Sequence, residues 1–262
     1  MSDDLVLQQI DGGVGRLTLN RPDKHNAFDD ALIAQLTAAL LSMEADRRVR
    51  TVVLAAAGKS FSAGADLVWM RRTAGYAEAE NLEDARALAG LMSTLERLAK
   101  PTVALVQGAA YGGGVGLVAC CDIAIASEAA SFSLSEVKLG LIPAVISPYV
   151  VAAMGPRAAR RFMLSAERFS AQQALHHGLV HEVVPADRLE EMGRHFVDHL
   201  AQGGPRAQAA AKELIASLAG RPVDRALVED TAERIARIRA GDEAREGLAA
   251  FLEKRPAEWR AK

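Results

Sequence analysis

The stretch "AAYGGGVGLVACCD", residues 109–122, holds four glycines within five residues of an otherwise apolar run. Glycine has no side chain to contribute chemistry, so these positions serve a backbone turn, the close approach of a ligand, or the absence of a side chain. At the start of a helix, several backbone N–H groups lack partners within the helix and can hold a negatively charged oxygen. Close packing of a helix on a sheet explains the same glycines without a ligand. Taken alone, the stretch leaves both explanations open.

Residues 114–119 also match G-x-G-x-x-A, the fingerprint of dinucleotide-binding folds. That fingerprint normally marks the first strand–helix unit, whereas two such units precede it here. The helix also has room for only a few residues before the apolar segment "DIAIAS" (122–127) begins. We therefore favour an oxyanion-binding turn over a dinucleotide site.

Strands and helices alternate around this stretch. A hairpin is predicted across residues 4–20, around the turn at Gly12 and Gly13. Apolar spacing predicts one helix through Leu32 and Leu40 and another through Leu88 and Leu95. Strands are predicted at 51–57, 102–107 and 122–127, and helices alone follow at 187–201, 206–218, 223–239 and 242–253. This order favours an α/β fold with a largely parallel sheet and a helical C-terminal part.

Composition excludes several classes of protein. The 262 residues are 50% apolar and 24% charged with a formal net charge of -2, which is typical of a globular chain and not of one that binds nucleic acid. The N-terminus has no signal-peptide pattern, and no run of about 18 apolar residues occurs. Cys120 and Cys121 lie in an apolar run, which favours packing over a disulfide or metal site. We expect a cytoplasmic protein without a metal, a nucleic-acid partner or a membrane segment.

A second turn, in "GKSFSAGADLVWM" (58–70), directly follows the strand predicted at 51–57. Ligands bind α/β sheets at the carboxyl ends of their strands, where this turn and the glycine run are both expected. Each turn has backbone N–H groups to offer. We therefore expect the two turns to share one cleft, although their spacing in sequence does not prove that they meet.

Glu136 lies in the largely apolar stretch "ASFSLSEVKLGLIPAVISPYV" (130–150). A carboxyl group among apolar neighbours tends to have a raised pKa, which suits general acid/base work. The alternative is a solvated glutamate, or one paired with Lys138 or a nearby arginine. No G-x-S-x-G motif occurs, and neither cysteine has a neighbouring histidine in sequence.

Six motifs, in order along the chain, make it similar to the enoyl-CoA hydratase/isomerase family, also called the crotonase family. They are "RPDKHNAF", "SFSAGADL", "GAAYGGGVGL", "CDIAIAS", "FSLSEVKLGLIP" and "FLEKRPAEW". The resemblance implies an α/β fold in which residues 1–200 form a crotonase-like spiral of β-β-α units with the coenzyme A thioester site. It further implies that residues 201–262 form a helical trimerisation region, and that the chain assembles as a homotrimer or a dimer of trimers.

The resemblance also implies an acyl-CoA thioester substrate and no separate cofactor, because coenzyme A is part of the substrate. By motif, Ala65 and Gly113 supply the two backbone N–H groups of an oxyanion hole for the thioester oxygen, and Glu136 is a catalytic acid/base. The positions implied in binding coenzyme A within one subunit are Lys24, Ala27, Ala63, Asp66 and Leu67. Phe251 and Lys254 are implied to reach a neighbouring subunit's ligand.

Two departures from the family pattern narrow the reaction. Gly116 stands where enoyl-CoA hydratases have the first of two catalytic glutamates, whereas Δ3-Δ2 isomerases of the family work with one carboxylate at the Glu136 position. "PAVISPYV" (143–150) replaces a glycine-rich segment. Together these features resemble bacterial methylglutaconyl-CoA hydratases of leucine breakdown and isohexenylglutaconyl-CoA hydratases of terpenoid breakdown. We hypothesise that Gly116 makes room for a branched acyl group or its carboxylate.

Three functions follow as candidates. The first is hydration of a branched, dicarboxylic 2-enoyl-CoA to a 3-hydroxyacyl-CoA, and the second is Δ3-Δ2 enoyl-CoA isomerisation with the same groups. The third is a non-catalytic protein that binds RNA or coenzyme A. The helix predicted across residues 30–43 contains no Lys or Arg, so no basic surface for RNA is evident there.

Overall fold

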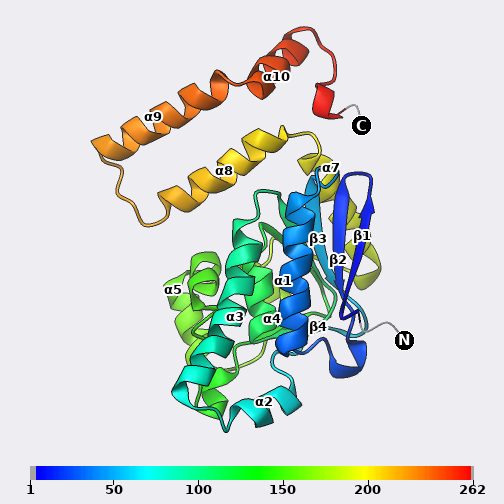
Figure 1. Ribbon diagram of the computed structural model, residues 1–262, viewed down its shortest axis with the longest axis vertical. Coiled ribbons are helices and arrows are strands. Elements are labelled where there is room, and N and C mark those ends of the chain that lie inside the picture. The colour runs from blue at the N-terminus through cyan, green and yellow to red at the C-terminus, as the bar shows by residue number, and fades with distance from the viewer. Residues whose placement is uncertain (1–3, 261–262) are drawn as a thin grey trace.

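The computed structural model describes residues 4–260, whose strands form two sheets (Figure 1). The larger sheet has the order β1-β2-β3-β5-β7-β10 and the smaller one β4-β6-β8-β9. β1 and β2 form the predicted antiparallel hairpin, and every other pair in the larger sheet is parallel. The strands of the larger sheet are β1 (Val6–Asp11), β2 (Val14–Leu19), β3 (Thr51–Ala56), β5 (Thr102–Val106), β7 (Ile123–Ser127) and β10 (Glu182–Val184). Those of the smaller sheet are β4 (Ser60–Ser62), β6 (Ala109–Tyr111), β8 (Ser131–Ser133) and β9 (Phe169–Ser170).

Consecutive units of the chain repeat the order strand, strand, helix. The pairs β3-β4, β5-β6 and β7-β8 each give their first strand to the larger sheet and their second to the smaller one. Helices α2 (Leu67–Thr73) and α3 (Glu78–Arg97) follow the first pair, α4 (Gly113–Cys120) the second and α5 (Ser147–Ser165) the third. This winding confirms the predicted crotonase-like spiral of β-β-α units.

Helix α1 (Asp30–Ala45) packs on α3 and covers one face of the larger sheet (Figure 1). Its N-terminus is capped by Asp29, whose side chain accepts a hydrogen bond of 2.9 Å from the N–H of Leu32. The buried side chains of α1 follow the helical period and join the main core: Leu32, Ile33, Leu36, Ala39, Leu40 and Met43. Removal of this apolar face from water is the main force that holds the helix on the sheet.

The opposite face of the larger sheet is covered by α7 (Leu189–Leu200), which contacts β5 and β7. This helix approaches the sheet closely at Gly193, where an added Cβ would lie 2.9 Å from Cδ2 of Leu105. The short helix α6 (Ala171–His176) leads into β10. A glycine in α7 thus fulfils a packing role with no ligand involved.

The chain ends in α8 (Pro205–Leu218), α9 (Arg225–Arg239) and α10 (Asp242–Leu252), which extend beyond the sheets (Figure 1). All three match the predicted helices to within about two residues, and the division into domains at residue 200 stays a prediction. Arg50, beside β3, holds this region by donating hydrogen bonds to the carbonyl oxygens of Gly203 (2.7 Å) and Trp259 (2.6 Å). Among residues 4–260, no helix combines the length and the apolar character that crossing a bilayer requires.

Candidate active site

The turn between β6 and α4 is built on Gly112, which has φ 48° and ψ -119°, a conformation that side chains disfavour. Its N–H donates to the carbonyl of Ser133 in β8 (2.9 Å), and its own carbonyl accepts from the N–H of Val115 (2.9 Å). Gly113 is the first residue of α4, and its N–H has no acceptor within residues 4–260. The glycine run therefore ends in a helix start with a free N–H donor.

A second turn leads from β4 into α2, around Gly64 (φ 88°) and Ala65. Phe28 forms a parallel bridge with Ala65: it donates to Gly64 O (2.7 Å) and accepts from Asp66 N (2.8 Å). Because successive peptide groups of an extended segment point to opposite sides, the N–H of Ala65 points away from Phe28. This N–H also has no acceptor among the described residues.

The two turns meet. A Cβ placed on Gly64 would lie 3.2 Å from the carbonyl oxygen of Tyr111 and 3.9 Å from the backbone nitrogen of Gly112. Gly114 packs still more closely on β4, because a Cβ there would lie 2.7 Å from the carbonyl oxygen of Ser62. The expectation that the two glycine-containing turns come together is confirmed, and the glycines allow their backbones to touch.

Glu136 lies against this pair of turns. It begins the 3-10 helix η2 (Glu136–Leu139) after β8, and a Cβ placed on Gly112 would lie 3.0 Å from its Oε1. Its Oε2 is buried and has no hydrogen-bond partner within residues 4–260. Burial raises the pKa of Glu136, an effect that its own backbone N–H only partly offsets.

The alternative of an ion-paired Glu136 is wrong. Lys138 donates instead to the carbonyl oxygen of Ala166 (2.7 Å), and no ion pair of the described residues includes Glu136. A half-buried carboxyl with one unpartnered oxygen and no ion pair, next to turns with two free N–H donors, is suited to acid/base catalysis.

The hypothesis that Gly116 makes room for a branched acyl group or its carboxylate is wrong. A Cβ there would lie 2.3 Å from Cγ2 of Ile146 and 3.1 Å from Cε of Met92. The space is thus filled by protein side chains, and Gly116 itself is buried. Ile146 stands in the unusual segment 143–150, so the two departures from the family pattern meet at one point.

The segment with Lys24 and Ala27 lies beside the strand-to-helix turn that contains Ala63. The Ala63 N–H donates to the carbonyl of His25 (2.9 Å). Asn26, which sequence reasoning did not single out, is fully buried and donates to two backbone carbonyls around the start of β4, at 2.9 Å each. Lys24 is exposed and Ala27 is buried. The segment thus lies beside the turn with the Lys24 side chain directed to solvent.

Asp66 has a structural task that sequence reasoning did not assign to it. Its buried carboxylate caps α2 by accepting from the N–H groups of Val68 (2.7 Å) and Trp69 (3.1 Å), and it pairs with Arg21 (3.1 Å). Although burial acts to raise the pKa of Asp66, these donors and the Arg21 charge bring it below its usual range. The next residue, Leu67, is 71% exposed at the start of α2. Asp66 thus fixes the turn that holds Ala65.

Phe251 and Lys254 are not brought to these turns by their own chain. Phe251 is 80% exposed in α10, and Lys254 follows that helix with φ 55°. Figure 1 shows α10 and α2 at opposite ends of the molecule. Within one chain, Phe251 and Lys254 therefore lie far from the turn that precedes α2.

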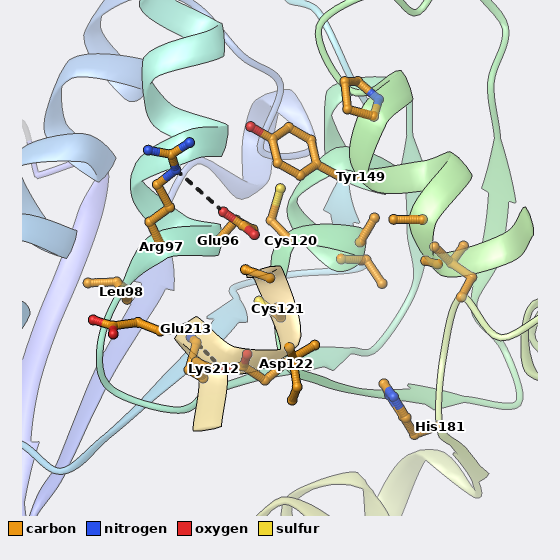
Figure 2. A pocket seen from close by; sticks show the side chains of 18 of the residues that line it. Glu96, Arg97, Leu98, Cys120, Cys121, Asp122, Tyr149, His181, Lys212 and Glu213 are labelled. Atoms are coloured by element: carbon orange, nitrogen blue, oxygen red, sulfur yellow. Dashed lines mark hydrogen bonds and ion pairs between the residues drawn. The ribbon is translucent and has the colours of Figure 1, made fainter. Parts of the chain in front are cut away.

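A cavity of about 1000 Å³ lies elsewhere, between α8 and the core (Figure 2). Lys212 on α8 reaches across it to pair with Asp122 (2.7 Å). Cys120 and Cys121 line its wall, and burial raises the pKa of both thiols, that of Cys121 to about 12. Both thiols are therefore protonated at neutral pH, and the prediction that they serve packing is confirmed by their burial.

The comparisons with known proteins agree with this geometry. The family profile described as enoyl-CoA hydratase/isomerase matches residues 9–262. A crystal structure of an enoyl-CoA hydratase from Shewanella pealeana is 50% identical with a TM-score of 0.95, covering 97% of this chain and 96% of that one. The chain belongs to the enoyl-CoA hydratase/isomerase family.

Two relatives from Escherichia coli strain K12 show the range of reactions in the family. One is named 2,3-dehydroadipyl-CoA hydratase and is 33% identical over 247 residues, which are 94% of each chain. The other is named 1,2-epoxyphenylacetyl-CoA isomerase and is 33% identical over 262 residues, with 99% of each chain covered. The chain is accordingly an enzyme of the hydratase/isomerase family that acts on coenzyme A thioesters, and the dinucleotide alternative is wrong.

Proposed function

We propose that this enzyme hydrates a branched, dicarboxylic 2-enoyl-CoA of the methylglutaconyl type to a 3-hydroxyacyl-CoA. The observation that carries the proposal is the unpaired, half-buried carboxyl of Glu136 against the turn at Gly112. The same turn presents the free N–H of Gly113, and the turn that meets it presents that of Ala65. These groups suit a reaction in which negative charge develops on a thioester oxygen.

In the proposed mechanism, the N–H groups of Ala65 and Gly113 hold the thioester oxygen and stabilise the enolate. Ionised Glu136 takes a proton from water as the water oxygen forms its bond to C3 of the enoyl group. The electron pair of the C2–C3 double bond moves toward the thioester, and Glu136 then returns the proton to C2. The elements of one water molecule are added, so no metal or redox cofactor is needed.

The second carboxylate of the substrate has a place in this mechanism. With Gly116 in place of the first glutamate, a carboxylate on the substrate supplies the group that orders the attacking water. The name of the E. coli relative, 2,3-dehydroadipyl-CoA hydratase, denotes a 2-enoyl thioester with such a carboxylate. Of the basic side chains on η2 and α2, Lys138 donates a hydrogen bond to the carbonyl oxygen of Ala166, and Arg72 pairs with Asp30. Arg71 has no ion pair within residues 4–260, so we assign it the distal carboxylate.

Isomerisation of a 3-enoyl-CoA to a 2-enoyl-CoA is the second candidate. One carboxylate suffices for it, because Glu136 removes a proton from C2 and returns it to C4. The burial of Gly116 against Ile146 favours this candidate, since it leaves no second carboxylate there.

We also propose that the enzyme works as a trimer or a dimer of trimers in the cytoplasm. Support comes from large exposed apolar side chains on and beside α9 and α10: Val223, Val228, Ile235, Leu248, Phe251 and Leu252. In such an assembly Phe251 and Lys254 approach a neighbouring subunit's coenzyme A, together with Lys24, Ala27, Ala63 and Leu67 of that subunit.

A panel of thioesters tests the proposal. Purified enzyme is assayed with 3-methylglutaconyl-CoA, crotonyl-CoA and trans-3-hexenoyl-CoA, following the ultraviolet absorbance of the 2-enoyl thioester. We expect the highest kcat/KM with 3-methylglutaconyl-CoA. Good turnover of the 3-enoyl thioester without turnover of 3-methylglutaconyl-CoA would establish the isomerase instead.

A further inference from the structure

Gly112, just before α4, and Gly116, four residues later within it, are covered by different side chains. Gly112 precedes the helix and lies against Oε1 of Glu136, whereas Gly116 lies against Cγ2 of Ile146. The backbone that leads into α4 thus meets a carboxylate at Gly112, and the helix itself meets an aliphatic side chain at Gly116.

Ile146 is held firmly in this position. It is 2% exposed, caps α5 with φ -90° and ψ -15°, and accepts a hydrogen bond from the N–H of Val150 (3.1 Å). Its Cβ as well as its Cγ2 crowds Gly116, because a Cβ there would lie 3.0 Å from the first and 2.3 Å from the second. A change of rotamer moves Cγ2 and leaves Cβ where it is, so the side chain cannot simply swing aside.

We propose that Ile146 is a specificity-determining residue: its side chain occupies the space beside α4 that a second carboxylate at position 116 needs, and so restricts catalysis to Glu136. The inference rests on the proposed thioester site. Substrates that bring their own carboxylate, or that need one base only, are accepted. Straight-chain 2-enoyl thioesters such as crotonyl-CoA lack the second group that orders the water, and they are disfavoured.

The test installs the second carboxylate with and without Ile146. Gly116→Glu alone overpacks the site, and we expect its melting temperature to fall by more than about 5 °C without a gain in crotonyl-CoA hydration. Gly116→Glu/Ile146→Gly removes the closest obstruction and leaves Cε of Met92, the flexible end of its side chain, 3.1 Å from a Cβ at position 116. Glycine is tolerated at a helix N-cap. For this double variant we expect kcat/KM with crotonyl-CoA to rise at least about 10-fold, the lower end of general acid/base effects being about 100-fold.

Three matched measurements separate this role from mere packing. In Gly116→Gln/Ile146→Gly the new side chain has the size of glutamate but carries no charge. The glutamate variant should show an additional acidic limb in its pH profile, from the second carboxylate. The glutamine variant should gain neither this limb nor activity with crotonyl-CoA. Gly193→Ala/Leu105→Ala alters a similar glycine–aliphatic contact away from the site, and should not gain either. Acetate added to Ile146→Gly should accelerate crotonyl-CoA hydration, and should leave the wild type unchanged.

A folded Gly116→Glu/Ile146→Gly enzyme that hydrates crotonyl-CoA no faster than its glutamine counterpart would overturn the inference. So would an equal gain in Gly116→Glu alone with an unchanged melting temperature, because Ile146 would then be no obstacle. If the double variant does not fold, the absence of acetate rescue in Ile146→Gly counts against the inference. Failure of the wild type on 3-methylglutaconyl-CoA would instead refute the proposed substrate and leave the crotonyl-CoA comparison decisive for Ile146.

Discussion

The turns at Gly64 and Gly112 and the C-terminal helices are held in different ways. At the turns, backbones touch and buried hydrogen bonds fix each strand to the next, as from Gly112 N to Ser133 O (2.9 Å). In α9 and α10, every residue of which is described, only Leu227 and Ala250 are buried. The chain by itself thus completes the site around Glu136, whereas its C-terminal helices leave an apolar surface uncovered.

The largest expected effect is on the chemistry at the turns. Glu136→Gln keeps the size of the side chain and removes its ability to accept a proton, so we expect kcat/KM to fall by about 10²- to 10⁴-fold. Circular dichroism and the oligomeric mass should stay unchanged. Glu182→Gln, which alters an exposed carboxyl on β10, is the control and should keep full activity. Unchanged turnover in Glu136→Gln would remove Glu136 from the mechanism.

The next effect tests the backbone of the turn. Gly112→Ala forces a Cβ into a disfavoured conformation and to within 3.0 Å of Glu136 Oε1, so we expect roughly a 10- to 100-fold loss of kcat and about 1–3 kcal/mol of destabilisation. Gly12→Ala shares the positive φ but meets nothing within 4 Å, and it should lose stability alone. Equal activity losses in both variants would mean that contact with Glu136 is not the cause.

The long elements of the fold and the short strands at the turns differ in how well the sequence predicts them. Periodicity predicted α1, α3 and the strands β1, β2, β3, β5 and β7 of the larger sheet, but neither β10 nor α5; in α1, for example, six buried positions recur at the helical period. It did not predict β4, β6, β8 and β9, which have two or three residues each and are too short for a period. These short strands bring the turns at Gly64 and Gly112 together, so the meeting of the turns stayed an expectation until the sheet order was known.

At the candidate site, motifs identified the residues but not their surroundings. Glu136, Ala65 and Gly113 stand in recognisable segments, and their roles remain proposals for experiment. The filling of the space beside Gly116 by Ile146, 30 positions further along the chain, depends on how α5 packs on α4. No local pattern records such a contact. The capping role of Asp66 could have been predicted from the sequence, because an aspartate directly before a helix is a standard N-cap signal.

Arg50 joins the two regions, and its replacement should loosen one of them. Arg50→Met removes two charge-assisted hydrogen bonds to the carbonyls of Gly203 and Trp259, which we expect to cost about 1.5–3 kcal/mol. Hydrogen exchange should quicken in α8–α10 and stay slow in β3. Arg48→Met, which breaks only an exposed pair with Asp46, should cost less than about 1 kcal/mol. Uniform quickening across the sheet would contradict the view that Arg50 anchors the C-terminal helices.

A smaller effect concerns stability and pH. Burial raises the pKa of Glu136 above its ordinary value of 4.5, so the folded chain keeps this proton at pH values where the unfolded chain has lost it. As pH rises from about 4.5 through the raised pKa, the wild type should lose stability relative to Glu136→Gln, and the gap should then stay constant. Urea unfolding of both proteins between pH 4.5 and 8 measures it. A gap that does not change with pH would show that Glu136 is not desolvated.

The smallest effect on the chain itself is expected at Phe251. Because this side chain is 80% exposed in one chain, Phe251→Ser should change the stability of the separate subunit by less than about 0.5 kcal/mol. In the proposed trimer the same side chain is covered by a neighbour, so the variant should dissociate at higher concentrations and raise KM more than it lowers kcat. Sedimentation velocity and steady-state kinetics over a range of protein concentrations measure both. Leu41→Ser, an exposed apolar residue of α1, is the control, and equal behaviour of the two variants would place the subunit contact elsewhere.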